Sequence, residues 1–537
     1  MSLPDHPNIL WLVAEDLSPY LAAYGDSTVS TPNLDWLAAG GVVYDRVFAS
    51  SPVCAPARAA LATGMYANAF GANHMRTGPW IFGDVPERVV ELARQNMPDG
   101  LIPYEAIPPP DARMVSEYLR MNGYYCSNNF KEDYQFRKPP TAWDESSPEA
   151  HWRKAPEGAP WFSVFNLDVT HESQIWAKAN DSLWVNGDLK VPVPPYLPDT
   201  EIGRSDVRRM YSNIAEMDAE VGRLLDQLRE DGLLDKTVIM FFGDHGGPLP
   251  RQKRLLYDSG LRVPLIVRFP GAQRSGTHDG RLISFVDFAP TLLSLARLPT
   301  PAHMQGRPWL GEYAGEPRDY VFAAADRFGP NYDSNRAARN DRFKYLRYYE
   351  PDKPRFLHTP YRDQMPIMQE LYRLRDEGQL TDVQAQWFLP GKPNEELFDT
   401  WEDPHELRNL ATDPRYADEL AELRAACSKW IDEINDQNIM PEPELVARLW
   451  PAEEQPVTGP VNVGRRGDSL ILTSATPGAS IGYRFVDEND SPTSTAWSIY
   501  QRPIIKPTEN QELYVIAHRI GYLPSDTTIL RSSDIEL

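Results

Sequence analysis

The sequence has little cysteine, a deficit of positive charge and no long apolar run. Only three cysteines occur in 537 residues, at positions 54, 126 and 427, which excludes a disulfide framework and leaves stability to the core. No apolar segment approaches the ~20 residues that cross a bilayer, so we expect no membrane span. Lys and Arg total 54 against 76 Asp and Glu, a net charge of −22. This balance argues against a nucleic-acid partner, because such binding depends on cationic side chains.

Four short apolar segments have the composition of buried strands of a parallel sheet, namely residues 8–14, 161–167, 237–242 and 263–269. Between the second and third of these, residues 205–231 repeat apolar side chains at the spacing of one helix face. Strands that alternate with helices in this way predict an α/β fold, with a mainly parallel sheet flanked by helices.

The pattern along the chain predicts four parts. Residues 1–320 form the α/β domain, and residues 321–450 form a smaller α+β subdomain in which strand and helix patterns are mixed. Residues 451–466 begin with the proline-rich, acidic stretch PAEEQPVTGP and are expected to be a linker. Residues 467–537 alternate short apolar runs with turn residues and predict a C-terminal β module.

Metal-binding residue types follow three of the predicted strands. Glu15 and Asp16 follow the first, the second leads to His171, and Asp244 and His245 follow the third. Ligands of open parallel sheets bind beyond the carboxyl ends of the strands, so these side chains should meet at one edge. Any one of them is explained equally well as a helix cap or turn former. Taken together, they favour a divalent-cation site.

The segment SPVCAPARAALATG, residues 51–64, places Cys54 just before a predicted helix. Pro56 suits the first turn of that helix, and its dipole favours an anionic thiolate or an incoming anion at Cys54. Arg58 follows one helical turn later, within reach of an anionic group. The alternative is a buried structural cysteine. The residues alone do not separate these two interpretations.

The motif formed by Cys54, Pro56 and Arg58 resembles the C-x-P-x-R signature of type I, formylglycine-dependent sulfatases of the alkaline phosphatase superfamily. The segments PNILWLVAEDLSPYLAAYGD, KRLLYDSGLRVPLIVRFPG and EELFDTWEDPHELRNLA also resemble that family and occur in its order. The resemblance covers roughly residues 7–450 and is strongest to the heparan N-sulfatase-like branch. It implies an alkaline phosphatase-like fold and an enzyme that hydrolyses sulfate esters.

The resemblance also implies a metal site and a modified nucleophile. Glu15, Asp16, Asp244 and His245 correspond to the family's calcium ligands, although Mg²⁺ or another divalent cation is also possible. The shell is completed by formylglycine, which a formylglycine-generating or sulfatase-maturing enzyme makes from Cys54. Hydrated formylglycine attacks sulfur in this family, the alcohol leaves, and the sulfate is then expelled as the aldehyde re-forms.

Four further residues acquire expected roles from the same resemblance. Arg58 stabilises the modified residue, Lys131 and Lys253 bind the sulfuryl oxygens, and His171 acts as general acid for the leaving oxygen. Three positions depart from the usual pattern. Glu15 replaces Asp, His245 replaces the Asn of many members, and Asp133 stands where His is common. These departures bear on metal geometry and on the breakdown of the sulfated intermediate.

Weaker candidates lie outside these motifs. His74 and Arg76 follow the nucleophile segment and suit a substrate subsite or a surface loop equally well. Arg327, Arg336 and Arg339 are candidates to hold an anionic sugar, although scattered arginines are usually solvated. In the C-terminal module, aromatic side chains suit sugar stacking or, more often, a core: Tyr483, Trp497, Tyr500 and Tyr522.

The sequence therefore predicts hydrolysis of a sulfate ester on a carbohydrate, with a sulfated oligosaccharide as substrate. The alternatives are an N-sulfoglucosamine sulfohydrolase, a phosphodiester or phosphonate hydrolase, and a degenerate, glycan-binding member without turnover. The N-terminus, MSLPDHPNIL, has no basic segment followed by an apolar one, as a secretory signal would. A periplasmic or secreted location is expected from the habit of the family alone.

Overall fold

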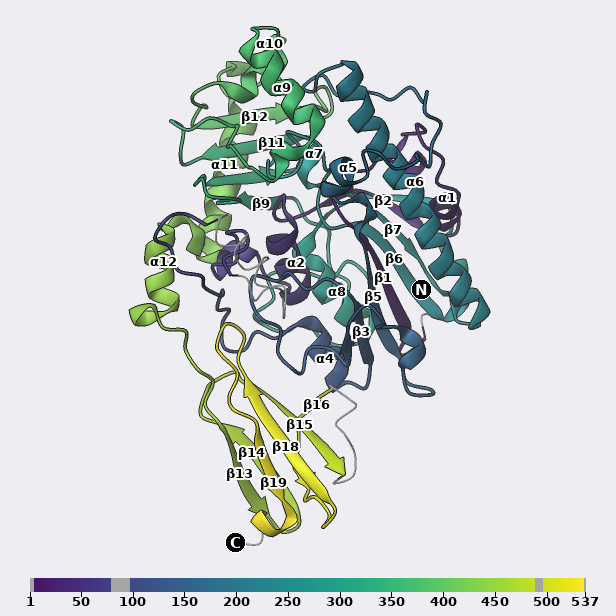
Figure 1. The fold of residues 1–537 in the computed structure, drawn as a ribbon, viewed down its shortest axis with the longest axis vertical. Helices are drawn as coiled ribbons and strands as arrows, with labels where there is room; N and C mark the ends of the chain where they lie inside the picture. The colour runs from purple at the N-terminus through teal and green to yellow at the C-terminus, as the bar shows by residue number, and fades with distance from the viewer. Residues whose placement is uncertain (1–3, 79–96, 488–495, 536–537) are drawn as a thin grey trace.

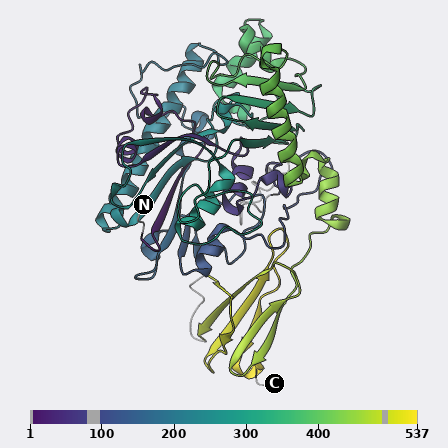
Figure 2. The ribbon, with the colours of Figure 1, turned by 180° about the vertical axis from the view of Figure 1, so that it is seen from behind.

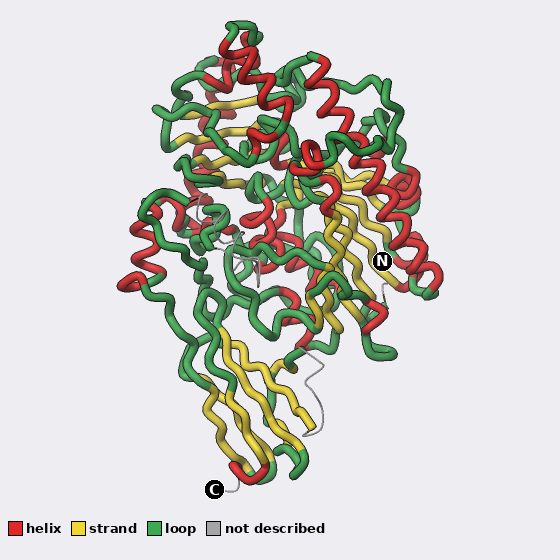
Figure 3. Tube along the Cα trace, in the orientation of Figure 1, coloured by secondary structure: helices red, strands yellow, loops and turns green. Residues whose placement is uncertain are grey.

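The protein is described by a computed structural model that covers residues 4–78, 97–487 and 496–535. A large sheet flanked by helices forms the N-terminal part (Figure 1). A four-stranded sheet lies beside it, and the C-terminal strands project as a separate module at the far end of the molecule (Figures 2 and 3). The predicted α/β class, with a mainly parallel sheet flanked by helices, is confirmed. No helix among the described residues is both long and apolar enough to cross a membrane.

The large sheet has eight strands, and its centre is parallel. Its order is β4 (Glu145–Ser146), β3 (Tyr125–Asn129), β5 (Trp161–Leu167), β1 (Asn8–Ala14), β6 (Thr237–Gly243), β7 (Arg262–Arg268), β2 (Val42–Phe48) and β8 (Thr277–Ser284). The strands from β4 to β6 pair in parallel, as do β2 and β8. The central strands are buried almost throughout, which explains their continuous apolar composition.

The prediction that residues 263–269 form another parallel strand was wrong in direction. The strand exists as β7, but it pairs antiparallel with both β6 and β2. Only the four-residue helix α7 (Asp258–Leu261) lies on the connection from β6 to β7. A parallel neighbour needs a crossover that returns along the length of the sheet. The connection at 244–261 stays instead at the edge where β6 ends.

Alternate residues of β1 contribute to two cores on opposite faces of the sheet. Trp11 and Val13 pack with α2 (Cys54–Thr63), α4 (Val115–Met121) and α8 (Phe288–Leu295). Leu10 and Leu12 pack with α1 (Pro32–Ala39) and α6 (Glu201–Glu230). The strand period of two thus divides the apolar side chains between two helical layers. The sequence-predicted helix at 205–231 is α6.

The N-terminus of helix α9 (Pro366–Asp376) contacts a buried carboxylate of α6. The backbone N–H of Ile367 donates to Asp206 Oδ2 at 2.6 Å. Burial raises the pKa of Asp206 to about 7. The folded protein therefore binds this proton more tightly than the unfolded chain does. The free energy of unfolding falls as the pH rises from the ordinary pKa of an aspartate to about 7.

We expect Asp206→Asn to be more stable than the parent at pH 8, because the amide removes a buried charge while its oxygen still accepts from Ile367. Each pKa unit corresponds to about 1.4 kcal/mol, so the gain should amount to a few kcal/mol and shrink at pH 5, where the parent carboxyl is protonated. Urea denaturation at both pH values measures the difference. An equal gain at pH 5 and pH 8 would contradict this account.

The second sheet is antiparallel, in the order β12 (Glu395–Asp399), β11 (Phe343–Tyr348), β10 (Asn335–Arg339) and β9 (Val321–Ala325). Helix α11 (Ala417–Ile434) packs across β10 and β11. The remaining helices of this part are α10 (Asp382–Ala385) and α12 (Glu442–Leu449), and the short helix α5 (Ser173–Ala177) belongs to the large domain.

The C-terminal module consists of two small antiparallel sheets with a shared apolar core. One contains β13 (Val461–Arg466), β14 (Ser469–Ser474) and β17 (Ile504–Ile505), and the other β16 (Ser498–Ile499), β15 (Ser480–Asp487), β18 (Gln511–His518) and β19 (Thr528–Arg531). Ser480 Oγ donates to Glu117 of α4 at 2.6 Å, and Arg120 donates to the carbonyl of Trp497 at 2.8 Å. Tyr483 and Tyr500 pack against the core of the module. The sugar-stacking role of the aromatic side chains stays a prediction.

Candidate functional site

Backbone hydrogen bonds bring together the residues that follow β5, β1 and β6. The N–H of Glu15 donates to Leu167 O at 3.1 Å, and the N–H of Asp244 donates to Ala14 O at 2.9 Å. The N–H of Leu17 donates to the carbonyl of His245 at 3.2 Å. The three parallel strands therefore release their polar residues at the same edge, as the sequence predicted for a parallel sheet.

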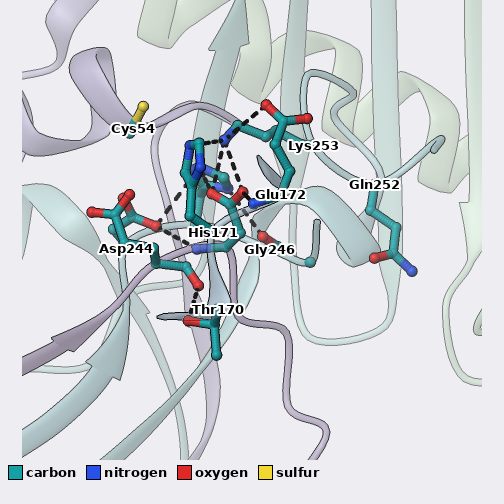
Figure 4. A network of polar contacts seen from close by, with 12 residues as sticks. Cys54, Thr170, His171, Glu172, Asp244, Gly246, Gln252 and Lys253 are labelled. Carbon is teal, nitrogen blue, oxygen red and sulfur yellow. Dashed lines mark hydrogen bonds and ion pairs between the residues drawn. The ribbon is translucent and has the colours of Figure 1, made fainter. Parts of the chain in front are cut away.

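Carboxylates and imidazoles converge at this edge (Figure 4). The ligand atoms of Asp16, Asp244 and His245 all lie within 4.8 Å of one another, and so do those of Glu15, Asp16 and His171. Asp16, Asp244 and His245 are completely buried. The backbone N–H of Asp16 also donates to Asp244 Oδ1 at 3.0 Å, which fixes one carboxylate against the other.

The tautomer of His245 suits a metal ligand. Its Nδ1 lies 3.0 Å from the carbonyl of Gly246, which can only accept, so Nδ1 carries a proton. Its Nε2 lies 3.0 Å from Asp16 Oδ1 and has no well-aligned hydrogen-bond partner among the described residues. Burial lowers the pKa of His245, but Asp244 and Asp16 outweigh it and raise the pKa to about 10. Nε2 therefore lies in a field that attracts positive charge.

The donor set fits a hard divalent cation. Glu15, Asp16 and Asp244 offer carboxylate oxygens, which Ca²⁺ and Mg²⁺ prefer, and His245 offers Nε2. An imidazole ligand also suits softer divalent ions. The observation that supports the fit is the buried Nε2, which makes no well-aligned hydrogen bond among the described residues and lies 3.0 Å from Asp16 Oδ1 and 3.7 Å from Asp244 Oδ1.

Glu15, Asp16 and Asp244 form an acidic cluster, and three cationic side chains contact it. Arg58 Nη2 lies 2.5 Å from Glu15 Oε1 and 3.2 Å from Asp244 Oδ2, and Lys131 Nζ lies 2.5 Å from Glu15 Oε2. Lys253 Nζ contacts both oxygens of Asp16, at 2.8 and 2.9 Å. Burial alone would raise the pKa of Glu15, but Lys131 and Arg58 hold it well below its usual range. The two lysines thus contact different carboxylates of the cluster.

Cys54 begins helix α2 and is completely buried. Arg76 Nη2 lies 3.6 Å from Cys54 Sγ and 3.7 Å from Asp133 Oδ2, so one nitrogen connects the two residues. Asp133 is 1% exposed and has a left-handed backbone, with φ of 52°. Neither of its carboxylate oxygens has a hydrogen-bond partner among the described residues. The structure thus brings Arg76 and Asp133 together beside Cys54.

His171 lies between Lys253 and Ser173. Its Nδ1 lies 2.8 Å from Ser173 Oγ and 3.3 Å from the backbone nitrogen of Ser173, and its Nε2 lies 3.3 Å from Lys253 Nζ. The lysine ammonium can only donate, so Nε2 accepts from it, and the proton of the neutral ring sits on Nδ1, which faces Ser173 Oγ. Burial, followed by Lys253, lowers the pKa of His171 to about 4. The ring is therefore neutral near pH 7.

The sequence interpretation missed Glu172 and Arg254, which join the site through an ion pair. Arg254 donates two hydrogen bonds to Glu172, at 2.8 and 2.6 Å, and Glu172 Oε1 lies 3.2 Å from Lys253 Nζ. The backbone N–H of Glu172 donates to Asp16 Oδ2 at 2.7 Å. The only signal in the sequence was adjacency, since Glu172 follows His171 and Arg254 follows Lys253.

The other predicted arginines are committed to buried ion pairs. Arg327 contacts Glu442 at 2.5 Å, and Arg336 contacts Asp326 at 2.8 Å and Asp436 at 2.5 Å. Both side chains are completely buried, so their predicted role in substrate binding finds no support in the structure. Arg339 contacts Asp258 at 3.2 Å and Thr400 at 2.8 Å. His74 is also buried, and its Nδ1 accepts from the N–H of Arg327 at 3.3 Å.

Gly246 leaves no room for a side chain next to the metal-binding residues. A Cβ at this position would lie 2.2 Å from the carbonyl oxygen of Ser259. We expect Gly246→Ala to displace His245 and to weaken divalent-cation binding about tenfold or more, because ligand geometry must hold within a few tenths of an ångström. Isothermal titration with Ca²⁺ measures the change. Gly187→Ala, where nothing lies within 4 Å, is the control, and equal affinities in both variants would contradict the prediction.

Comparison with known proteins identifies relatives of the whole chain. The sulfatase family profile matches residues 7–97 and 115–298, and the profile of the N-sulphoglucosamine sulphohydrolase C-terminal region matches residues 249–387. An ulvan-active sulfatase of Formosa agariphila is 45% identical, over 100% of this chain and 93% of that protein. Human N-sulphoglucosamine sulphohydrolase is 27% identical, over 80% of this chain and 90% of that protein.

Solved structures agree with the fold. A structure determined in complex with its substrate, D-glucosamine-2-N,6-O-disulfate, superposes with a TM-score of 0.57, at 16% identity, over 81% of this chain and 99% of that chain. The family profile spans half of the sequence, and the Formosa relative spans all of it. The chain therefore belongs to the sulfatase family and is a sulfuric ester hydrolase.

Proposed function

We propose that this sulfatase hydrolyses sulfate esters on carbohydrates, with formylglycine made from Cys54 and a divalent cation held by Glu15, Asp16, Asp244 and His245. The observation that supports it is the convergence of Cys54, two lysines and the acidic cluster at one sheet edge. The substrate class is supported by the 45% identical relative, which is an ulvan-active sulfatase. A sulfated oligosaccharide would enter as a short anion.

Glu15, Asp16, Asp244 and His245 would hold a divalent cation, which would supply Lewis-acid chemistry at a sulfate oxygen, and formylglycine at position 54 would supply a hydrated aldehyde. The protein's own residues then position the sulfate. Lys131 contacts Glu15 and Lys253 contacts Asp16, and both offset charge on the sulfuryl oxygens. Arg76 lies 3.6 Å from Cys54 Sγ and contributes positive charge there, while Arg58, on the same helix as Cys54, stabilises the modified residue.

His171 donates the proton to the leaving oxygen in this proposal. Its low pKa in the free protein arises from burial and from Lys253. A bound sulfate brings negative charge next to the ring and raises that pKa, which favours the protonated form when it is needed. In the protonated ring, Nδ1 can donate to Ser173 Oγ, 2.8 Å away, and Nε2 carries the proton for the leaving oxygen.

An N-sulfate is the second candidate bond. The N-sulphoglucosamine sulphohydrolase profile covers residues 249–387, which include Lys253, and the human enzyme of that name is 27% identical. The leaving atom would then be nitrogen in place of oxygen, and the same lysines and His171 would serve it.

Two measurements test the proposal. The protein is produced with a formylglycine-generating enzyme, and the peptide that contains Cys54 should lose about 18 Da, the mass change from cysteine to formylglycine. The matured protein is then assayed on O-sulfated sugars, N-sulfated glucosamine and phosphate esters, with O-sulfate turnover expected. Glycan binding without turnover in modified protein would favour the degenerate member, and preferential turnover of N-sulfate or phosphate would favour those alternatives.

Export to the periplasm or medium belongs to the same proposal, and cell fractionation tests it.

A further inference from the structure

A cleft lies next to Lys253. Its empty space, open solvent included, is about 440 Å³, and it is lined by Arg254 and Leu255, by the residues after β9, and by the segment 355–362. Three arginines, Arg254, Arg355 and Arg362, contribute to its wall. A protein of net charge −22 thus places three guanidinium groups around one cleft.

Most charges of this wall are compensated within the protein. Arg254 is paired with Glu172 and Arg355 with Glu396. The two acidic residues of the wall are compensated as well, because Asp326 contacts Arg336 at 2.8 Å and Asp333 contacts Lys392 at 3.0 Å. His358 contacts Asp363 at 2.6 Å.

Arg362 is the exception. It is 4% exposed, and its Nη2 donates to the carbonyl of Leu357 at 2.6 Å. Among the described residues, Nε has no hydrogen-bond partner, and no carboxylate oxygen lies within 4 Å of the guanidinium nitrogens. Burial and the neighbouring Arg254 lower the pKa of Arg362 to about 10. A buried cation without a counterion is costly, and a bound anion removes that cost.

The cleft adjoins the site where the sulfate is expected. Tyr361, the residue before Arg362, lies with its ring 6.3 Å from that of His171 and 5.2 Å from that of Trp176. On the other side, Glu172 lies between Arg254 and Lys253, at 2.6 and 3.2 Å, and Figure 4 shows Glu172 next to Lys253. One ion pair therefore separates the cleft from the lysine that contacts Asp16.

We infer that this cleft binds a second anionic group of the substrate sugar, a carboxylate or a further sulfate, through Arg362 with Arg254 beside it. The inference rests on the proposed function, since it assumes a sugar whose sulfate ester lies at Lys253. One ion pair separates the cleft from Lys253. This spacing suits a substituent of the same sugar ring or of the adjacent one. Arg362 also packs over Phe356 and Trp387, 5.0 Å from each ring. A purely structural role in holding this segment is therefore the competing explanation.

The test compares matured parent, Arg362→Met and Arg362→Lys on matched sugar sulfates. Each set shares one sulfated ring and differs in one substituent, which is a hydroxymethyl group, a carboxylate or a second sulfate. We expect the parent to prefer an anionic member by about tenfold or more in kcat/KM, mainly through KM. Arg362→Met should lose that preference yet keep turnover of the neutral member within about twofold, and Arg362→Lys should retain part of it. Which anionic member is preferred distinguishes carboxylate from sulfate.

Arg375→Met is the matched control, because Arg375 also lies over two aromatic rings, at 5.0 and 5.5 Å, but outside the cleft. Equal loss on neutral and anionic members, with a lowered melting temperature, would assign Arg362 a packing role and overturn the inference, as would a parent without preference. If the parent turns over no sulfated sugar, the proposed function fails. Calorimetric binding of D-glucuronate and D-glucose to parent and Arg362→Met then decides the inference, and equal affinity of the two proteins for glucuronate overturns it.

Discussion

Cys54→Ala is expected to abolish sulfate-ester hydrolysis, with a loss of about 10⁴-fold or more in kcat after production with the maturing enzyme. Alanine cannot become formylglycine, so the nucleophile is removed while the cation site and both lysines remain. The side chain is buried at the start of α2, where alanine fits without a clash. Initial rates on an aryl sulfate and on the best sugar sulfate measure the loss.

Cys126→Ala provides the matched control. Cys126 is as fully buried as Cys54 but lies in β3, where it packs in the apolar core and its Sγ donates to the carbonyl of Ser116 at 3.7 Å. We expect this variant to lose some stability and to keep its turnover. Comparable loss of activity in both variants would show that removal of any buried thiol disturbs the fold, and would remove the special role of position 54.

Removal of the divalent cation is expected to reduce turnover by at least about a hundredfold, because a Lewis acid at the sulfate contributes several kcal/mol to transition-state stabilisation. Asp16→Asn should do the same, since Asp16 is common to both groups of potential ligands and also receives Lys253 and the N–H of Glu172. The chelated enzyme should melt at a lower temperature, because a ligand that binds the folded state stabilises it.

The measurement is activity and melting temperature after dialysis against a chelator, followed by addition of Ca²⁺, Mg²⁺ or Mn²⁺. Recovery should be complete in the parent and absent in Asp16→Asn. Asp206→Asn removes another buried carboxylate, far from the cluster along the chain, and should recover its activity as fully as the parent when the cation is added back. Full activity after chelation, with the bound metal shown to be absent by elemental analysis, would rule out the cation in the mechanism.

The strand ends of the catalytic edge were predictable because they depend on local patterns. Buried parallel strands are short and continuously apolar, so the residues that follow them, such as Asp16 and Asp244, are identified as soon as the strands are. The helix at Cys54 was likewise predictable from Pro56 and the alanine run. The role of these residues as ligands came from the family resemblance and remains a proposal.

Other features depend on contacts between distant parts of the chain and leave no local signal. The direction of β7 is set by the route of the connection from β6, which composition does not encode. Arg327 and Arg336 were predicted as candidates to hold an anionic sugar, with solvated surface as the alternative. Their partners Glu442 and Asp436 come from a segment about a hundred residues later, which a local pattern cannot reveal. Arg362 was overlooked for the same reason. Its significance is that no carboxylate of the described residues pairs with it in the folded cleft.

The antiparallel direction of β7 has a consequence for the order in which the site assembles. Asp244, His245 and Lys253 all lie on the connection between β6 and β7, two neighbouring strands that meet as soon as this stretch closes on itself. Glu15 and Asp16 join them only when β1 pairs with β6, a contact between residues far apart in the chain. Because chain closure becomes slower and entropically costlier with sequence separation, the half-site on the connection can form early. The pairing of β1 with β6 is then the folding event that completes the acidic cluster.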